Sequence, residues 1–145
     1  MSLWIKRLHL VFTIGGGFAG FVLSLSNIPG VIGAGFATLV LVTAFAAFYA
    51  YAIVVGIRLV EGKPSRRHLI FFYGAQLPVL SSPIFAYQLC AGAFVNVALI
   101  GTSLNLNAQL GANFNTTLLQ ESPWGIGMNL VAFAMLVVVA RENDV

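Results

Sequence analysis

Long apolar runs separated by a few short polar segments make up most of the chain. Three stretches carry no Asp, Glu, Lys or Arg: 8–57, 68–120 and 122–140. A membrane-spanning helix needs about 20 mostly apolar residues, because each residue rises about 1.5 Å and the hydrocarbon core is about 30 Å thick. The first stretch is long enough for two such helices, and the Asn-Ile-Pro-Gly sequence at 27–30 predicts the turn between them.

This pattern predicts an all-α membrane protein that forms a single integral membrane domain over residues 1–145. We expect a bundle of four transmembrane helices. A polar outer loop over residues 101–123 is predicted to connect the third helix to the fourth. The predicted helices cover residues 8–26, 31–57, 69–100 and 124–140. Ser122 and Pro123 are a typical helix start and favour the last of these boundaries.

The basic residues predict the orientation of the chain in the membrane. All seven Lys and Arg side chains lie before residue 8, between residues 58 and 67, or at residue 141. Four helices would bring these three segments to the same side. Because basic loops stay in the cytoplasm, both termini are predicted to be cytoplasmic, in a bacterial inner membrane.

The composition excludes several other classes of protein. Of the 145 residues, 59% are hydrophobic and 8% are charged, against about 25% charged in soluble domains. This excludes a water-soluble monomer and a disordered chain. The single cysteine, Cys90, excludes an internal disulfide. Because no basic and aromatic surface is available for nucleic acid, membrane lipids are the expected partners.

Small and hydroxylated residues form a stripe on the first predicted helix. The members of this stripe are Thr13, Gly16, Gly17, Gly20 and Ser24. Such a face lets another helix approach closely, which is how helices associate in lipid. The partner is either the second helix of the same chain, another copy in a homo-oligomer, or another membrane protein.

Polar residues also follow one side of the third predicted helix. They are Tyr73, Gln76, Ser81, Tyr87 and Gln88. Pro78 and Pro83 would bend this helix and free backbone carbonyl groups. A bent helix with a polar stripe can line a cavity for a ligand, a quinone or a lipid headgroup. The alternative is a bend stabilised only by hydrogen bonds between helices.

These features favour a non-enzymatic membrane protein that binds a lipid or a membrane partner. The sequence contains no nucleophilic triad, phosphate-binding loop or carboxylate pair, so no catalytic residue is predicted. No charged residue lies within a predicted helix, which argues against an ion-coupled transporter. An oligomeric pore lined by Ser81, Gln88 and Asn96 is an alternative, although Phe85, Val95 and Leu99 interrupt its polar face.

The two histidines suggest a further alternative. His9 and His68 begin helices that run in the same direction, so both imidazoles are expected at the same depth. Two histidines from two helices can bind the iron of haem b. No Cys and His spacing typical of a metal site is present. The alternative function is therefore a haem-binding redox or porphyrin-handling protein.

Part of the sequence resembles a known family of membrane proteins. The opening Leu-Trp-Ile-Lys-Arg-Leu-His at 3–9 is similar to the start of the HemJ-type protoporphyrinogen oxidases and the wider CopD-like proteins. The residues at 58–59, 66–68, 72–73 and 78–80 are similar to the segment by which that family enters its last helix. The resemblance implies a four-helix membrane scaffold, and it implies a haem-linked role for His9.

A different periodicity appears in the predicted outer loop. Leucine and alanine alternate with asparagine and glutamine over residues 103–110, and Gly111 begins a sequence typical of a turn. Period two is the signature of a strand, which predicts a short β-hairpin. One interpretation is that the edge of this hairpin pairs with a strand of a partner protein. The other is that the hairpin only covers the helix bundle with its apolar face.

Overall fold

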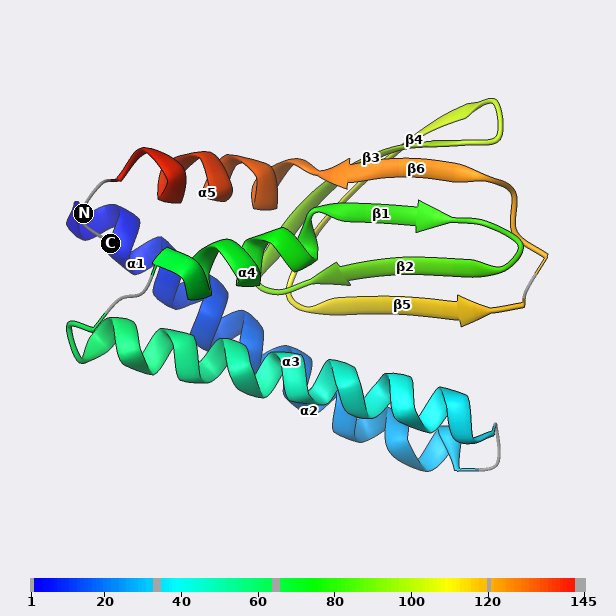
Figure 1. The fold of residues 1–145 in the computed structure, drawn as a ribbon, viewed down its shortest axis with the longest axis horizontal. Helices are drawn as coiled ribbons and strands as arrows, with labels where there is room; N and C mark the ends of the chain where they lie inside the picture. Colours follow the sequence, from blue (N-terminus) through cyan, green and yellow to red (C-terminus); the bar gives the residue numbers. More distant parts are fainter. Residues whose placement is uncertain (1, 33–34, 64–65, 120, 143–145) are drawn as a thin grey trace.

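A computed structural model describes residues 2–32, 35–63, 66–119 and 121–142 of the chain (Figure 1). It contains a six-stranded antiparallel sheet beside the helices, so the predicted all-α four-helix bundle is wrong. The helices are α1 (Leu3–Leu10), α2 (Gly16–Val31), α3 (Phe36–Val60), α4 (Arg66–Gln76) and α5 (Leu130–Arg141), with a π-helical turn η1 (Val11–Gly15). The strands are β1 (Pro78–Ser81), β2 (Phe85–Cys90), β3 (Ala93–Ile100), β4 (Ser103–Leu110), β5 (Asn113–Leu118) and β6 (Gly125–Asn129).

The first half of the chain is helical, as the apolar runs predict. Helices α1 and α2 join through η1 into one continuous helix of 29 residues, and α3 has 25 residues. Both are long and apolar enough to cross a membrane. The turn predicted at 27–30 lies inside α2 instead, with Pro29 in the last helical turn. Residues 33 and 34, which were assigned to the second helix, lie outside the described residues.

The helix predicted over 69–100 is replaced by α4 and three strands. Helix α4 ends at Gln76 because Pro78 has no N–H and disfavours helical geometry at Leu77. Pro78 therefore begins β1 rather than bending a helix. The residues that follow are rich in aromatic and β-branched side chains, which fit a pleated sheet better than a helix.

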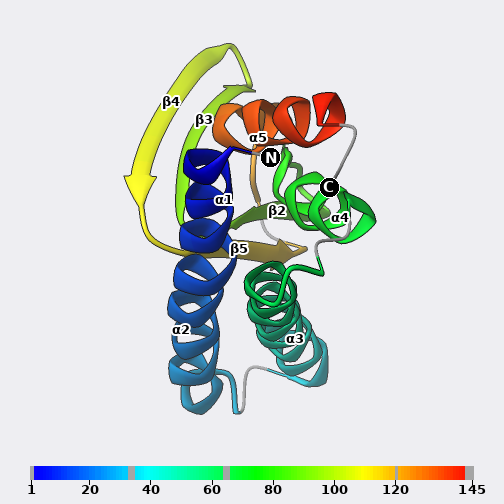
Figure 2. The same ribbon diagram turned by 90° about the vertical axis from the view of Figure 1, so that its left-hand side faces the viewer.

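Four of the six strands form one long hairpin, β2–β3 against β4–β5, which is folded in half, and β6 and β1 pair between its two halves. The strand order is β4-β3-β6-β1-β2-β5, with every neighbouring pair antiparallel. Strands β2 and β3 meet at Gly92, and β4 and β5 meet at Gly111. Both glycines have positive φ, 92° and 113°, a conformation that other residues rarely adopt. The sheet curls as a result, so that β3 and β4 curve away from β5 (Figure 2).

The predicted outer loop of 101–123 is therefore mostly sheet. The strand expected over 103–110 is present as β4, but it pairs with β3, with Leu104 opposite Leu99. The hairpin turn lies at Gly101 rather than at Gly111, which instead leads to β5 at the opposite edge of the sheet.

The last predicted helix, 124–140, also begins as a strand. Strand β6 runs to Asn129, and α5 starts only at Leu130. Asn129 is the N-cap, because its side chain accepts hydrogen bonds from the N–H groups of Val131 and Ala132. Ser122 does not begin a helix, since Gly125 and Gly127 disfavour helix over the residues that follow it.

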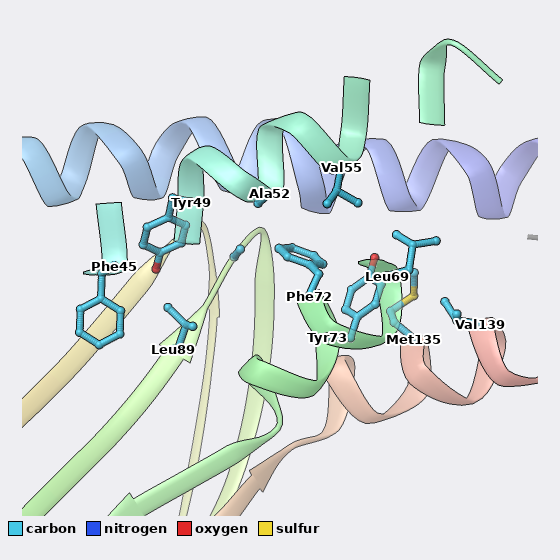
Figure 3. Close-up of a cluster of buried hydrophobic side chains, with 11 residues drawn as sticks. Phe45, Tyr49, Ala52, Val55, Leu69, Phe72, Tyr73, Leu89, Met135 and Val139 are labelled. Atoms are coloured by element: carbon cyan, nitrogen blue, oxygen red, sulfur yellow. The ribbon is translucent and has the colours of Figure 1, made fainter. Parts of the chain in front are cut away.

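The hydrophobic core lies where the helices meet the sheet (Figure 3). Tyr49 and Ala52 of α3 face Phe72 of α4 and Leu89 of β2, and the Phe72 ring stacks on Phe48 at 5.8 Å. Helices α4 and α5 pack together beside this cluster; α4 begins and α5 ends at the pole of the molecule where α1 begins (Figure 1). The sheet extends toward the opposite pole, beside α2 and the first half of α3.

Candidate functional site

The two faces of the sheet differ sharply in chemistry. Residues opposite one another in neighbouring strands point to the same face of the sheet. The strand register therefore assigns each side chain to one of the two faces. One face carries nearly all the amides and hydroxyls, interspersed with Val79, Ala86, Cys90, Phe94, Ala98 and Ile100; its polar members are Ser81, Gln88, Asn96, Ser103, Asn105, Asn107, Gln109, Asn113, Asn115, Thr117 and Asn129. The other is mainly apolar: Leu80, Tyr87, Leu89, Val95, Val97, Leu99, Leu104, Leu106, Leu110, Phe114, Ile126 and Met128.

The polar face is the inner, concave face of the curl. A cavity of about 170 Å³ is lined by Ser81, Gln88, Asn115 and Thr117 together with Ile100 of β3. Strand β3 is not a neighbour of β2 or β5 in the sheet. The Ile100 side chain of β3 therefore reaches the residues of β2 and β5 only across the concave side of the sheet. The Asn129 amide likewise reaches the Cys90 thiol, with an N to S distance of 3.8 Å, from β6 to β2.

Glycines on the inner face permit the tight curl between β6 and β3. A Cβ at Gly127 would overlap the Val97 carbonyl oxygen, and one at Gly125 would lie 2.9 Å from the Leu99 carbonyl oxygen. Both positions therefore require a residue without a side chain. The curvature follows, and it brings the amides of non-neighbouring strands together.

Two amides inside the curl have only the Cys90 thiol as a side-chain partner for their buried atoms among the described residues. The Gln88 Nε2 atom and both amide atoms of Asn96 are buried without a nitrogen or oxygen partner, and Asn96 is only 4% exposed. Both side chains approach the Cys90 thiol, so they lie near each other. A buried polar group without a partner costs about 1–3 kcal/mol. Of these two amides, Gln88 lines the cavity of about 170 Å³, where it can hydrogen-bond a guest group.

The chemistry of the cavity selects an uncharged guest. The six strands, all within the described residues, carry no charged side chain. Amides and hydroxyls hydrogen-bond to hydroxyl, carbonyl and amide groups. An ionised guest would lose its hydration without gaining a counter-charge, which is unfavourable.

No family model, curated protein or solved structure matches the chain. The site therefore rests on its own geometry. Among the described residues, no three His, Cys, Asp or Glu side chains come together as a metal site would require.

The polar stripe expected on one helix is divided between two places. Ser81 and Gln88 line the inner cavity. Tyr73 and Gln76 lie in α4, where the Gln76 Oε1 atom accepts from the Ala91 N–H at 2.7 Å. Tyr87 lies on the outer face of β2 and donates to the Ala75 carbonyl at 2.7 Å. Gln76 and Tyr87 thus join α4 to the sheet, and of the two only Tyr87 also borders the cavity of about 170 Å³.

The two histidines bind separate partners. His9 is fully buried, and its Nδ1 atom lies 2.8 Å from the Tyr73 hydroxyl while Nε2 has no partner. His68 contacts the Tyr51 hydroxyl through Nδ1 and the Arg58 guanidinium through Nε2, at 2.7 and 2.9 Å. Because arginine only donates, Nε2 accepts and Nδ1 carries the proton. Neither nitrogen of His68 is free to bind an iron.

The stripe of small residues packs within the chain. Gly17 and Gly20 of α2 face Tyr49 of α3, and Gly16 lies against the backbone of Gly92 at the bend of the sheet. The hydroxyls of Thr13 and Ser24 donate to carbonyls of their own helix, His9 and Gly20. Of the three partners considered for this stripe, the structure shows contact with elements of the same chain.

Sequence reasoning missed Asn115 and Thr117 as cavity residues. They were assigned to a loop, although Asn113, Asn115 and Thr117 repeat with period two. That repeat is the signal that could have placed them together on one face of a strand. Asn96 was assigned to a pore, and it belongs to the same inner face as Ser81 and Gln88.

Proposed function

We propose that this is an integral membrane protein whose curled sheet binds the uncharged polar part of an amphipathic molecule. One observation carries the proposal. Over β3, β4 and β6 the outer face of the sheet is apolar and largely exposed, while the inner face carries the amides, and the buried atoms of Gln88 and Asn96 have no nitrogen or oxygen partner among the described residues. A soluble protein buries its apolar face and exposes its polar face, whereas membrane-inserted sheets reverse this arrangement.

The dimensions of the molecule support its placement in a bilayer. At about 1.5 Å per residue, the helices of 29 and 25 residues are about 43 and 37 Å long. Strand β6 and helix α5 run on as one element of about 34 Å, which also exceeds the hydrocarbon thickness of about 30 Å. A sheet that continues into a helix can thus cross the membrane beside α2 and α3.

The exposed residues are those expected to contact lipid. Leu106, Leu110 and Ile126 are 70%, 85% and 69% exposed on the outer face of the sheet, and Phe18 of α2 is largely exposed too. The outer faces of β3, β4 and β6 also form an apolar groove of about 510 Å³. In water this surface would be unfavourable, and in a bilayer it is covered by acyl chains.

The charges and tryptophans support one orientation. The basic ends of α1, α3, α4 and α5 share one pole, which we place in the cytoplasm of a bacterial cell (Figure 1). Trp4 in α1 and Trp124 beside β6 are both exposed and belong to opposite poles. Tryptophan is enriched at both membrane interfaces, so the two side chains mark the two surfaces.

The size of the inner cavity limits its guest to a headgroup-sized fragment. A volume of about 170 Å³ is below the 300–1,000 Å³ typical of drug-sized ligands. The guest we propose is a hydroxyl or amide headgroup whose apolar tail stays in the membrane. The Gln88 and Asn115 amides, which line the cavity, supply its hydrogen bonds.

Replacing both amides tests this function. We expect Gln88→Leu with Asn115→Leu to lower occupancy by the bound amphiphile about 10–100-fold, since each lost hydrogen bond contributes about 0.5–1.5 kcal/mol. Native mass spectrometry of protein extracted in mild detergent measures the occupancy. Asn27→Leu is the matched control, because this exposed amide lies on α2 and only donates to the Leu23 carbonyl. Equal occupancy in the double variant and the control would contradict the proposal.

A further inference from the structure

One arginine at the basic pole of the molecule is held by a neutral histidine instead of a carboxylate. Tyr51 and Arg58 lie seven residues apart in α3, so both side chains leave the same face of that helix. His68 of α4 joins them, with its Nδ1 atom 2.7 Å from the Tyr51 hydroxyl and its Nε2 atom 2.9 Å from Arg58 Nη1. The imidazole also meets the Tyr51 ring edge to face, with the ring centroids 5.8 Å apart. These contacts fix the imidazole, which in turn orients the guanidinium that donates to it.

The histidine orients Arg58 without neutralising its charge. A neutral imidazole offers only a hydrogen-bond acceptor, and this contact uses one of the five N–H donors of the guanidinium. Arg67 precedes His68 in α4 and is exposed, as Arg58 is. Among the described residues neither arginine lies within 4.0 Å of a carboxylate, because the ion pair at this pole joins Lys63 to Glu61, at 3.8 Å. Two guanidinium groups thus keep their full positive charge near the junction of α3 and α4.

Both arginines lie at the depth of the lipid phosphates in the membrane placement proposed above. Helix α3 has 25 residues and is about 37 Å long, against about 30 Å of hydrocarbon, so its ends reach the headgroups. Arg58 belongs to its last turn, and Arg67 to the first turn of α4. All seven Lys and Arg residues lie at this pole, and the described carboxylates there are those of Glu61 and Glu142. The net positive charge of the pole therefore attracts anions.

We infer that Arg58 and Arg67 bind the phosphate of an anionic phospholipid in the cytoplasmic leaflet. A guanidinium can bind two phosphate oxygens through parallel N–H donors, and an arginine that is already oriented loses little freedom in doing so. The uncompensated charges select a lipid with a net negative charge, since a zwitterionic lipid adds an ammonium group that they repel. The inference uses the membrane placement proposed above, but it is independent of the inner cavity, whose guest is uncharged.

Lipid selectivity measured by native mass spectrometry tests this site. The purified chain is titrated in mild detergent with phosphatidylglycerol or phosphatidylcholine bearing the same acyl chains. We expect phosphatidylglycerol to bind at least about tenfold more tightly, and Arg58→Gln to weaken its binding about fivefold, which is the contribution of one basic side chain near an anionic surface. Lys63→Gln is the matched control, because it removes the same charge from the same pole but that charge is already paired with Glu61. It should change the affinity less than about twofold.

His68 is a positioning residue, and substitutions there separate orientation from charge. His68→Ala keeps both arginines, yet it should weaken phosphatidylglycerol binding about threefold, because Arg58 must then be ordered when the lipid binds. His68→Gln should restore the affinity, since the glutamine Oε1 atom can accept from Arg58 as Nε2 does.

Several results would overturn the inference. One is equal affinity of the wild-type chain for the two lipids, and another is an equal loss in Arg58→Gln and Lys63→Gln. A third is loss of selectivity when sodium phosphate replaces sodium chloride at the same ionic strength, because the site would then take a free anion. Gln88→Leu with Asn115→Leu should keep full selectivity for phosphatidylglycerol, so a failure of this site is distinguishable from a failure of the inner cavity.

Discussion

Replacing Gly16 by alanine should destabilise the protein by about 3 kcal/mol or more, since overpacking costs typically 1–3 kcal/mol and here neither neighbour can move easily. An added Cβ would overlap the backbone nitrogen of Gly92 and the carbonyl carbon of Ala91. Both atoms belong to the bend between β2 and β3, whose geometry the positive φ of Gly92 sets. The first helix would have to move away from the sheet.

Thermal unfolding in detergent measures this effect. At about 2–4 °C per kcal/mol, Gly16→Ala should lower Tm by about 6–12 °C. Gly15→Ala is the matched control, because nothing lies within 4 Å of its added Cβ. Glycine is also about 1 kcal/mol less favourable than alanine in a helix, so this control should raise Tm slightly. Similar Tm values for the two variants would show that the first helix does not contact the bend of the sheet.

Asn129→Ala should be the second most destabilising substitution, at about 2–4 kcal/mol. The Asn129 side chain is fully buried where β6 becomes α5. Its Oδ1 atom accepts from the N–H groups of Val131, Ala132 and Val95, at 3.1, 3.4 and 3.4 Å. Alanine removes the helix cap, at about 0.5–2 kcal/mol, and leaves the part-buried Val95 N–H without this acceptor, at about 1–3 kcal/mol.

The control for this substitution is Asn105→Ala. Asn105 is exposed on β4, and its amide donates only to the Ser103 carbonyl at 3.3 Å. A surface change of this kind alters stability by no more than about 0.5 kcal/mol. Equal losses for the two variants, measured by chemical or thermal unfolding, would mean that Asn129 does not join the strand to the helix.

The two long helices were predictable because their apolar runs exceed what any strand needs. No short-range signal competes with helix over residues 8–26 or 36–57. The segment 69–100 was not predictable by the same reasoning, because it is also apolar and uncharged. Its inner face in β3 is marked by a single polar residue, Asn96, so the alternation expected of a strand is hidden. Pro78 was the clearest signal, and it ends a helix as readily as it bends one.

The candidate site was only partly predictable for a related reason. Ser81 and Gln88 were identified from their polarity within an apolar run, and that remains true in a strand. Asn115 and Thr117 come from a segment with ordinary loop composition. They reach the cavity only through the pairing of β5 with β2, a contact between distant parts of the chain. Periodicity alone does not specify such a pairing.

Spin labels along β4 provide the most direct test of the central claim, that the sheet lies in the membrane with its polar face inside. Single labels at successive positions from 103 to 110 replace exposed side chains, so the fold tolerates them. We predict that labels at Leu104, Leu106 and Leu110 are relaxed by oxygen dissolved in the bilayer. Labels at Asn105 and Asn107 should instead be relaxed by a water-soluble nickel chelate, giving a period of two. Uniform access of the chelate to all positions, or a period near 3.6, would contradict the account.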